Sequence, residues 1–239
     1  MKKIILSLGL LFCSFLVQAQ DENDTTYTIQ SFLYNWNHPE NGKAKLLDSV
    51  DQMVVVFRER YRDIKVAGVE KINGVWVLKQ APARASIGRN GLVYAVAKKE
   101  GDGCTPAGLF ALGQLFSYAQ QVDVKLPFIK TTEQDKWIDD PTSEEYNQYV
   151  RGNTKAKSFE NLLLNNIYYK YCMVIEYNTH PVVKGKGSAI FFHVADEKLS
   201  PTAGCVAIAE KDMVQYLQWL APNKRKAIFI IADEEDEED

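Results

Sequence analysis

The chain carries its apolar residues in short runs, rich in valine, isoleucine, phenylalanine and tyrosine and separated by polar or glycine-containing stretches. Runs of this kind are typical of β-strands. Residues 64–70 and 75–79 flank Asn73-Gly74, the strongest short signal for a β-hairpin, and residues 81–85 are expected to form a loop. The pattern predicts strands over residues 52–59, 64–70, 75–79, 92–97, 171–177, 189–194, 205–209 and 227–232, and a further strand that is entered at Leu109.

Helical signals are few. The clearest covers residues 210–220, whose apolar side chains share one helical face, and Pro222 ends this helix. Thr142 and Glu145 have the spacing of a capping box, so we expect a second helix to begin at Thr142. Residues 158–166 predict another short helix. The pattern as a whole therefore predicts a mainly β fold with a few short helices.

Residues 1–19 have the organisation of a secretory signal peptide. Lys2 and Lys3 precede an apolar run over residues 4–17, and Ala19 ends a small-residue cleavage site. We therefore expect a secreted protein, periplasmic where the host has two membranes, that is cleaved after Ala19. No later apolar run reaches membrane-spanning length, so no membrane span is expected in the mature protein.

The rest of the chain divides by composition into three parts. Residues 20–52 form a polar and aromatic leader, residues 53–232 hold the strands of one domain, and residues 233–239 form an acidic tail. The formal net charge is −3, but without the two lysines of the signal and the seven acids of the tail the body has 26 basic and 24 acidic residues. A nearly neutral body gives no argument for nucleic-acid binding.

The best candidate for chemistry lies in residues 188–208. His193 is near the C-terminal end of one apolar strand, and Cys205 begins the next strand after a turn over residues 201–204. Two neighbouring strand ends can bring an imidazole to a thiol, and a histidine is the usual means of making a cysteine nucleophilic. Gly204 lets a substrate approach the backbone, and the N–H groups beside it are suited to an oxyanion hole.

This stretch resembles the catalytic segment of the L,D-transpeptidases, the YkuD-like cell-wall enzymes. Their motif is a histidine on one strand, a spacer, and then Ser/Thr-x-Gly-Cys. The matching residues here are His193, Thr202, Gly204 and Cys205. A second family signature, Thr-Pro-x-Gly-x-Phe, precedes the catalytic segment and is matched by residues 105–110. The linked motifs make the resemblance fairly specific.

The chain departs from the commonest form of the motif at two positions. Ala203 stands where that form has histidine, and Ala207 stands where it often has arginine or asparagine. Both departures leave the matched nucleophile and base in place. The resemblance spans roughly residues 53–233 and implies an L,D-transpeptidase-like β-sandwich or mixed-sheet catalytic domain.

The resemblance also implies an acyltransferase of cell-wall biogenesis and cell shape that uses no cofactor and whose partners are peptidoglycan stem peptides. Cys205 would attack the amide between a diamino acid and D-alanine, with His193 as general acid–base. Thr202, Ala203 and Gly204 would support the oxyanion. An amine of a second stem would then resolve the thioester and form a cross-link.

Residues 137–149 contain candidates for the wall of the substrate groove: Trp137, Asp139, Asp140 and Tyr146. Acids in such a wall can hold the ammonium groups of a stem peptide. A charged turn before a helix is the simpler explanation of the two aspartates, because acids are common at helix N-termini.

Three cysteines remain after removal of the signal: Cys104, Cys172 and Cys205. An odd number in an oxidising compartment leaves at least one thiol unpaired or paired between chains. A disulfide between Cys104 and Cys172 stays open at this point. No Cys-x-x-Cys pair or histidine–cysteine cluster has metal-ligand spacing, so no metal site is expected.

Two other functions remain open. Water as acceptor would make the chain an L,D-carboxypeptidase or amidase, and loss of turnover would leave a non-catalytic cell-wall-binding protein. Taken singly, His193 is explained as a satisfied buried histidine and Cys205 as a small core residue. Their conjunction with Thr202, Gly204, the upstream signature and the secretory signal favours a catalytic dyad.

Overall fold

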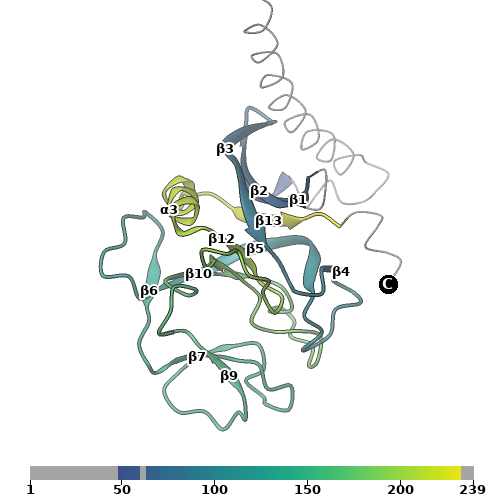
Figure 1. The fold of residues 1–239 in the computed structure, drawn as a ribbon, viewed down its shortest axis with the longest axis vertical. Coiled ribbons are helices and arrows are strands. Elements are labelled where there is room, and N and C mark those ends of the chain that lie inside the picture. The colour runs from purple at the N-terminus through teal and green to yellow at the C-terminus, as the bar shows by residue number, and fades with distance from the viewer. Residues whose placement is uncertain (1–47, 60–62, 233–239) are drawn as a thin grey trace, which may run out of the picture.

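The computed structural model describes residues 48–59 and 63–232 (Figure 1). Within them the chain is strand-rich, which confirms the predicted mainly β fold. The strands are β1 (Gln52–Arg58), β2 (Ile64–Ile72), β3 (Val75–Ser86), β4 (Leu92–Tyr94), β5 (Thr105–Ser117), β6 (Phe128–Lys130), β7 (Asp135–Ile138), β8 (Tyr149–Arg151), β9 (Phe159–Asn161), β10 (Tyr171–Ile175), β11 (Phe191–Val194), β12 (Val206–Ile208) and β13 (Lys226–Ile230). The helix whose bounds fall in this part of the chain is α3 (Glu210–Trp219).

The predicted signal peptide (residues 1–19), nearly all of the leader (residues 20–52) and the acidic tail (residues 233–239) lie outside the described residues. Their boundaries stay predictions. Within residues 48–59 and 63–232, no helix has both the length and the apolar character needed to cross a membrane.

Most strands belong to one mixed sheet with the order β10-β11-β12-β3-β2-β1-β13-β5-β4, and β6 pairs with β5. Strand β5 also pairs with β10, so the path of strands closes on itself. The two strands shared by both halves, β3 and β5, are the longest in the structure, at 12 and 13 residues. Their length lets each run from one half of the sheet into the other, so the halves face each other across a common core.

The core between the two halves follows from the period of two along each strand. Val54 and Val56 of β1 point into it, together with Phe192 and Val194 of β11. Helix α3 closes this core with Met213, Tyr216 and Leu217, which are all buried. The ring of Tyr216 meets that of Phe192 edge-on, with centroids 6.2 Å apart. The predicted helix over residues 210–220 is therefore confirmed. It packs against the sheet because this buries its apolar face.

The hairpin at Asn73-Gly74 is confirmed, with φ angles of 51° and 83° at these residues. The predicted loop at residues 81–85 is wrong, because β3 continues as a strand to Ser86. The pairing of β2 with β3 shifts register between Val66 and Gly68. Pro82 lies opposite this irregularity, where the missing N–H of a proline is tolerated.

The helices predicted at Thr142 and over residues 158–166 are both wrong. The carboxylate of Asp140 accepts hydrogen bonds from the N–H (2.9 Å) and the hydroxyl (2.7 Å) of Thr142, and also from the N–H of Lys157 (2.8 Å). Thr142 therefore serves a turn and not a helix cap. Residues 159–161 form β9, which pairs with β7.

Strands β8, β7 and β9 form a small separate sheet that packs over the outer face of β10 and β11. It appears in Figure 1 as the green segments around β7 and β9, away from α3. Buried Asp135 anchors this sheet by accepting hydrogen bonds from Arg151 (2.7 Å), Thr132 (2.7 Å) and Tyr149. This small sheet thus forms a wall beside the ends of β11 and β12.

Two loops are tied to the turn before β12. The N–H of Arg89 donates to the carbonyl of Thr202 (2.9 Å), and the N–H of Thr202 donates to the carbonyl of Ile87 (2.8 Å). The N–H of Gly88 donates to the hydroxyl of Thr105 (2.8 Å). A side chain at Gly88 has no room, since its Cβ would lie 2.3 Å from the carbonyl oxygen of Gly103.

We predict that Gly88→Ala lowers the free energy of unfolding by about 2 kcal/mol, as expected for overpacking against backbone. Gly74→Ala is the matched control, because a Cβ there would meet no atom within 4 Å and only the positive φ is penalised, at about 1 kcal/mol. Urea unfolding of both variants tests this. An equal or larger loss in Gly74→Ala would contradict the role given to Gly88.

Candidate active site

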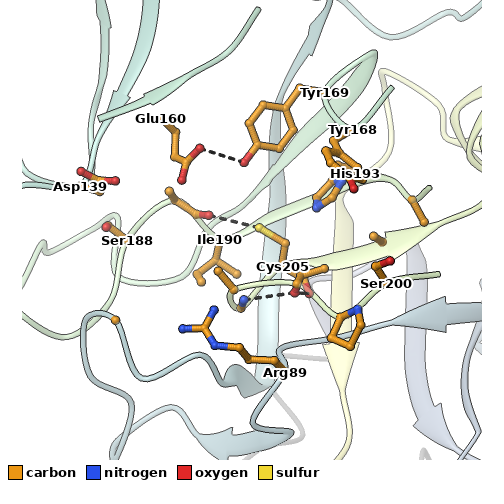
Figure 2. A pocket seen from close by; sticks show the side chains of 18 of the residues that line it. Arg89, Asp139, Glu160, Tyr168, Tyr169, Ser188, Ile190, His193, Ser200 and Cys205 are labelled. Carbon is orange, nitrogen blue, oxygen red and sulfur yellow. Dashed lines mark hydrogen bonds between the residues drawn. The ribbon is translucent and has the colours of Figure 1, made fainter. Parts of the chain in front are cut away.

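The register of β11 and β12 determines which residues of the two strands share a face. The strands are parallel, with Phe192 opposite Val206 and His193 opposite Ala207. Because side chains alternate, Phe192 and Val206 point into the core between the sheet halves, whereas His193 and Cys205 belong to the other face. Figure 2 shows the imidazole and the thiol at the same pocket. The structure thus brings the two residues singled out from the sequence to one pocket, His193 on β11 and Cys205 directly before the neighbouring strand β12.

Thr202 and Gly204 shape the turn that delivers Cys205. The hydroxyl of Thr202 donates to the carbonyl of Cys205 (2.7 Å) and accepts from the N–H of Gly204 (3.1 Å). Gly204 has φ 149°, and a Cβ there would lie 2.9 Å from the carbonyl oxygen of Cys104. The residue must therefore be glycine, for its backbone angle and for the close approach of the loop that leads into β5.

The imidazole of His193 is held in one tautomer. Its Nδ1 lies 2.8 Å from the carbonyl oxygen of Val194. A carbonyl only accepts hydrogen bonds, so Nδ1 carries the proton and Nε2 is left as the acceptor. The ring of Tyr169 meets the imidazole edge-on, with centroids 5.3 Å apart. Burial lowers the pKa of His193 to about 4, so this imidazole is neutral at pH 7.

The thiol of Cys205 is buried, with 7% of the residue exposed. It donates to the carbonyl of Ala189 (3.3 Å) and accepts from the N–H of Phe191 (3.4 Å). Burial raises the pKa of this thiol to about 12, although the Phe191 N–H opposes the shift. The resting pair therefore consists of a neutral thiol and a neutral imidazole, and not of a thiolate and an imidazolium.

Cys205 and His193 line a common cavity of about 460 Å³. Ala203 and Ala207 also line it, so the two small residues that depart from the family motif leave space beside the nucleophile. The charged side chains of the wall come from loops and from the small sheet, and they are Arg89, Lys98, Glu100, Asp139 and Glu160. The cavity therefore combines a nucleophile and a base with groups of both charges.

Of the four groove residues predicted from the sequence, Asp139 lines this cavity. Trp137 supports the site from behind by packing edge-on against Phe191, with ring centroids 5.4 Å apart. The hydroxyl of buried Tyr146 donates to Glu100, which itself lines the cavity. Asp140 is structural, because its hydrogen bonds, led by that from the Lys157 N–H, hold the turn and lower the pKa of its carboxyl to about 2.

Sequence reasoning missed several residues of the cavity wall, among them Arg89, Glu160 and Tyr169. Arg89 lies between Gly88 and Gly91, a pattern that indicates a turn, but its position beside Thr202 depends on pairing between distant loops. Glu160 was assigned to a helix, whereas its place in β9 brings it to the cavity. The alternation around Phe159 and Glu160 is too short to have revealed the strand.

All three cysteines in the described residues are free thiols, so a disulfide between Cys104 and Cys172 is absent from this part of the chain. Cys172 lies opposite His193 in the pairing of β10 with β11 and is fully buried. The thiol of Cys104 donates to the carbonyl of Asn90 (3.4 Å) and is not part of the cavity wall. Cys205 is the cysteine that the cavity exposes to a substrate.

No curated protein matches the chain. One solved structure that it resembles is the helical cell shape determining protein Pgp2 from Campylobacter jejuni, with 18% sequence identity and a TM-score of 0.42. The match covers 78% of this chain and 49% of that one, so the chain spans about half the length of Pgp2. The model of the YkuD L,D-transpeptidase catalytic domain matches residues 53–229. That match covers most of the chain, which therefore belongs to the YkuD family of L,D-transpeptidase catalytic domains.

Proposed function

We propose that this protein is a cysteine-dependent L,D-transpeptidase that acts on peptidoglycan stem peptides in the cell envelope. Membership of the family supports a role in peptidoglycan chemistry. The observation that carries the specific reaction is the placement of the His193 imidazole and the Cys205 thiol on one face of the sheet, at one cavity. Each is held by backbone groups, so the geometry does not depend on mobile side chains.

The reaction begins with a neutral pair. The S–H bond of Cys205 turns from the carbonyl of Ala189 toward Nε2 of His193, which accepts the proton as sulfur attacks the amide carbonyl of the donor stem. The C–N bond then breaks, and the imidazolium returns its proton to the leaving amine. This leaves a thioester on Cys205 and a neutral imidazole. An amine of a second stem then attacks the thioester carbonyl and gives its proton to His193. The C–S bond breaks, the imidazolium protonates the departing sulfur, and the cross-linked product is released with the thiol of Cys205 restored.

The tetrahedral oxyanion needs donors in the turn before β12. The N–H of Gly204 is already engaged by the hydroxyl of Thr202 at 3.1 Å. We therefore assign the oxyanion to the N–H groups that flank Gly204, those of Ala203 and Cys205. The role of Thr202 in this scheme is to hold the turn, through its bonds to Gly204 and to the carbonyl of Cys205.

The proposal predicts that Cys205→Ala abolishes turnover of purified muropeptides, because no other nucleophile lines the same position. Cys205→Ser should be nearly as poor, since a lone imidazole activates a hydroxyl weakly. His193→Ala should lose at least about a hundredfold in rate, the low end for loss of a general acid–base. The amount of each product, identified by its mass after timed incubation, measures the turnover of each variant. Cys104→Ser is the matched control and should keep most of the activity.

The products formed by the wild-type protein show whether an amine or water accepts the acyl group. Cross-linked dimers support transfer to an amine. Shortened monomers would assign the same dyad to hydrolysis, and material left unchanged under all conditions would favour a protein that only binds the wall. Turnover retained in Cys205→Ala would place the nucleophile elsewhere.

The neutral resting pair predicts the pH dependence of alkylation at Cys205. The raised pKa keeps the thiol protonated at pH 7, so the rate with iodoacetamide should rise with pH through pH 9 and show no plateau near neutrality. Peptide mass spectrometry after timed quenching measures this at the single residue. A plateau already reached between pH 5 and 7 would indicate a thiolate–imidazolium pair and overturn the neutral assignment.

Export is part of the proposal, because peptidoglycan lies outside the cytoplasm. The signal at residues 1–19 predicts that the protein recovered from cell envelopes begins at Gln20. N-terminal peptide sequencing tests this. A protein that retains Met1 in the producing cell would contradict export by cleavage of this signal.

A further inference from the structure

Two acidic side chains stand together on the cavity wall contributed by the small sheet. Glu160 lies in β9, directly opposite Trp137 of β7, and Asp139 follows the last residue of β7. Both line the cavity that contains Cys205. Figure 2 shows the two carboxyl groups at the same end of the pocket, on the side away from Arg89. The two strands thus bring two carboxylates to one part of the substrate cavity.

These two half-buried carboxylates have few hydrogen-bond partners within the protein. Oδ1 of Asp139 is buried and accepts no hydrogen bond. Glu160 accepts one long hydrogen bond, 3.4 Å from the hydroxyl of Tyr169. Burial raises the pKa of Glu160, and the charge of Asp139 raises it further. A buried carboxylate oxygen without a donor, beside a second acid, is unfavourable unless a proton or a cation joins it.

The protein itself does not supply that cation. Among the described residues, no salt bridge involves Asp139 or Glu160. Of the two basic residues in the cavity wall, Lys98 is committed to Asp102, with its ammonium 2.6 Å from the carboxylate and 2.9 Å from the carbonyl of Lys99. The other, Arg89, lies on the opposite side of the pocket (Figure 2). A positive charge that completes the pair would therefore come from a molecule in the cavity.

We propose that Asp139 and Glu160 form a subsite that binds a primary ammonium group of the donor substrate. This deepens the proposed function and rests on it: in a stem peptide the group is the free amine of the diamino acid whose carbonyl is attacked. An ammonium has three N–H donors, enough to satisfy Oδ1 of Asp139 and the free oxygen of Glu160 together. Charge-assisted hydrogen bonds to both carboxylates would orient the donor relative to the sulfur of Cys205.

A metal ion suits the pair less well than an ammonium does. In the part of the chain that the structure describes, no three histidine, cysteine or acidic side chains are arranged to hold a metal ion. Two carboxylates and a nearby tyrosine hydroxyl offer three acceptor groups, one for each N–H donor of an ammonium.

The chemistry of transfer also decides which substrate amine the subsite holds. An acceptor amine must be neutral in order to attack the thioester. Two adjacent carboxylates stabilise the protonated form and raise the pKa of an amine bound between them. A subsite of this kind therefore suits a bystander ammonium on the donor and would hinder the acceptor amine.

The test crosses two substrates with three variants. The substrates are one tetrapeptide stem with the free side-chain amine of its diamino acid and the same stem with that amine acetylated. The variants are Asp139→Asn, Glu160→Gln and the control Glu133→Gln, which removes an exposed acid outside the cavity. The measured quantity is kcat/KM for acylation of Cys205, with the release of D-alanine as the readout. Thermal unfolding checks that each variant is folded, and iodoacetamide labelling checks that its Cys205 is reactive.

We expect the wild type and Glu133→Gln to prefer the free amine roughly 10- to 100-fold, the range for loss of a hydrogen bond to a charged group. Asp139→Asn and Glu160→Gln should lose that preference while acylation by the acetylated stem stays within about threefold of wild type. Both replacements keep the size and shape of the side chain and remove only its charge. If one variant does not fold, the other alone still tests the subsite.

The outcomes separate this subsite from the proposed function. If the wild type releases D-alanine but both variants keep the full preference for the free amine, the subsite is overturned and the transpeptidase proposal stands. If the wild type shows no preference, the subsite is overturned as well. Absence of acylation by either stem, in a folded protein whose Cys205 still reacts with iodoacetamide, would overturn the proposed function instead.

Discussion

The parallel pairing of β11 with β12 determines what the cavity contains. Side chains alternate along a strand, so a slip of one residue would turn His193 into the core and bring Val194 to the cavity. The apolar residues of the inner face oppose such a slip, because Phe192 and Val206 would have to leave the core. The bonds between Thr202 and the loop at residues 87–89 fix the other end of the connection. Packing on the inner face of β11 and β12 thus keeps His193 and Cys205 at the cavity on the outer face.

Burial of this dyad has a consequence for how it is activated. Removal from water disfavours the charged forms of both groups, which raises the pKa of Cys205 and lowers that of His193. The resting site therefore avoids the free energy of a buried ion pair, and in the proposed mechanism the thiol is activated only when a substrate carbonyl and the oxyanion donors are in place. A protonated, buried thiol also resists oxidation.

The prediction from sequence agrees with the structure where the local pattern of apolar residues determines the secondary structure. Short apolar runs were sufficient to predict β1, β2, β10, β11, β12 and β13, and the motif identified His193 and Cys205 as neighbours before the pairing of their strands was known. The failures have non-local causes. Thr142 bears the signature of a helix cap, but Asp140 and Lys157 recruit it into a turn. Glu160 was placed in a helix because nothing in residues 158–166 reveals that β7 is its partner.

The same small sheet explains why the groove was the least predictable part of the site. Ala203 and Ala207 put only methyl groups into the cavity at positions where the commonest form of the motif has larger polar side chains. Polar recognition must then come from other walls, and among the nearest are the loop with Arg89 and the sheet with Asp139 and Glu160. The sheet is joined to the rest of the protein through Trp137 and Phe191, which pack edge-on just behind the nucleophile. Under the proposed function, substrate selectivity would therefore reside on an element that can change its sequence while β11 and β12 keep His193 and Cys205 unchanged.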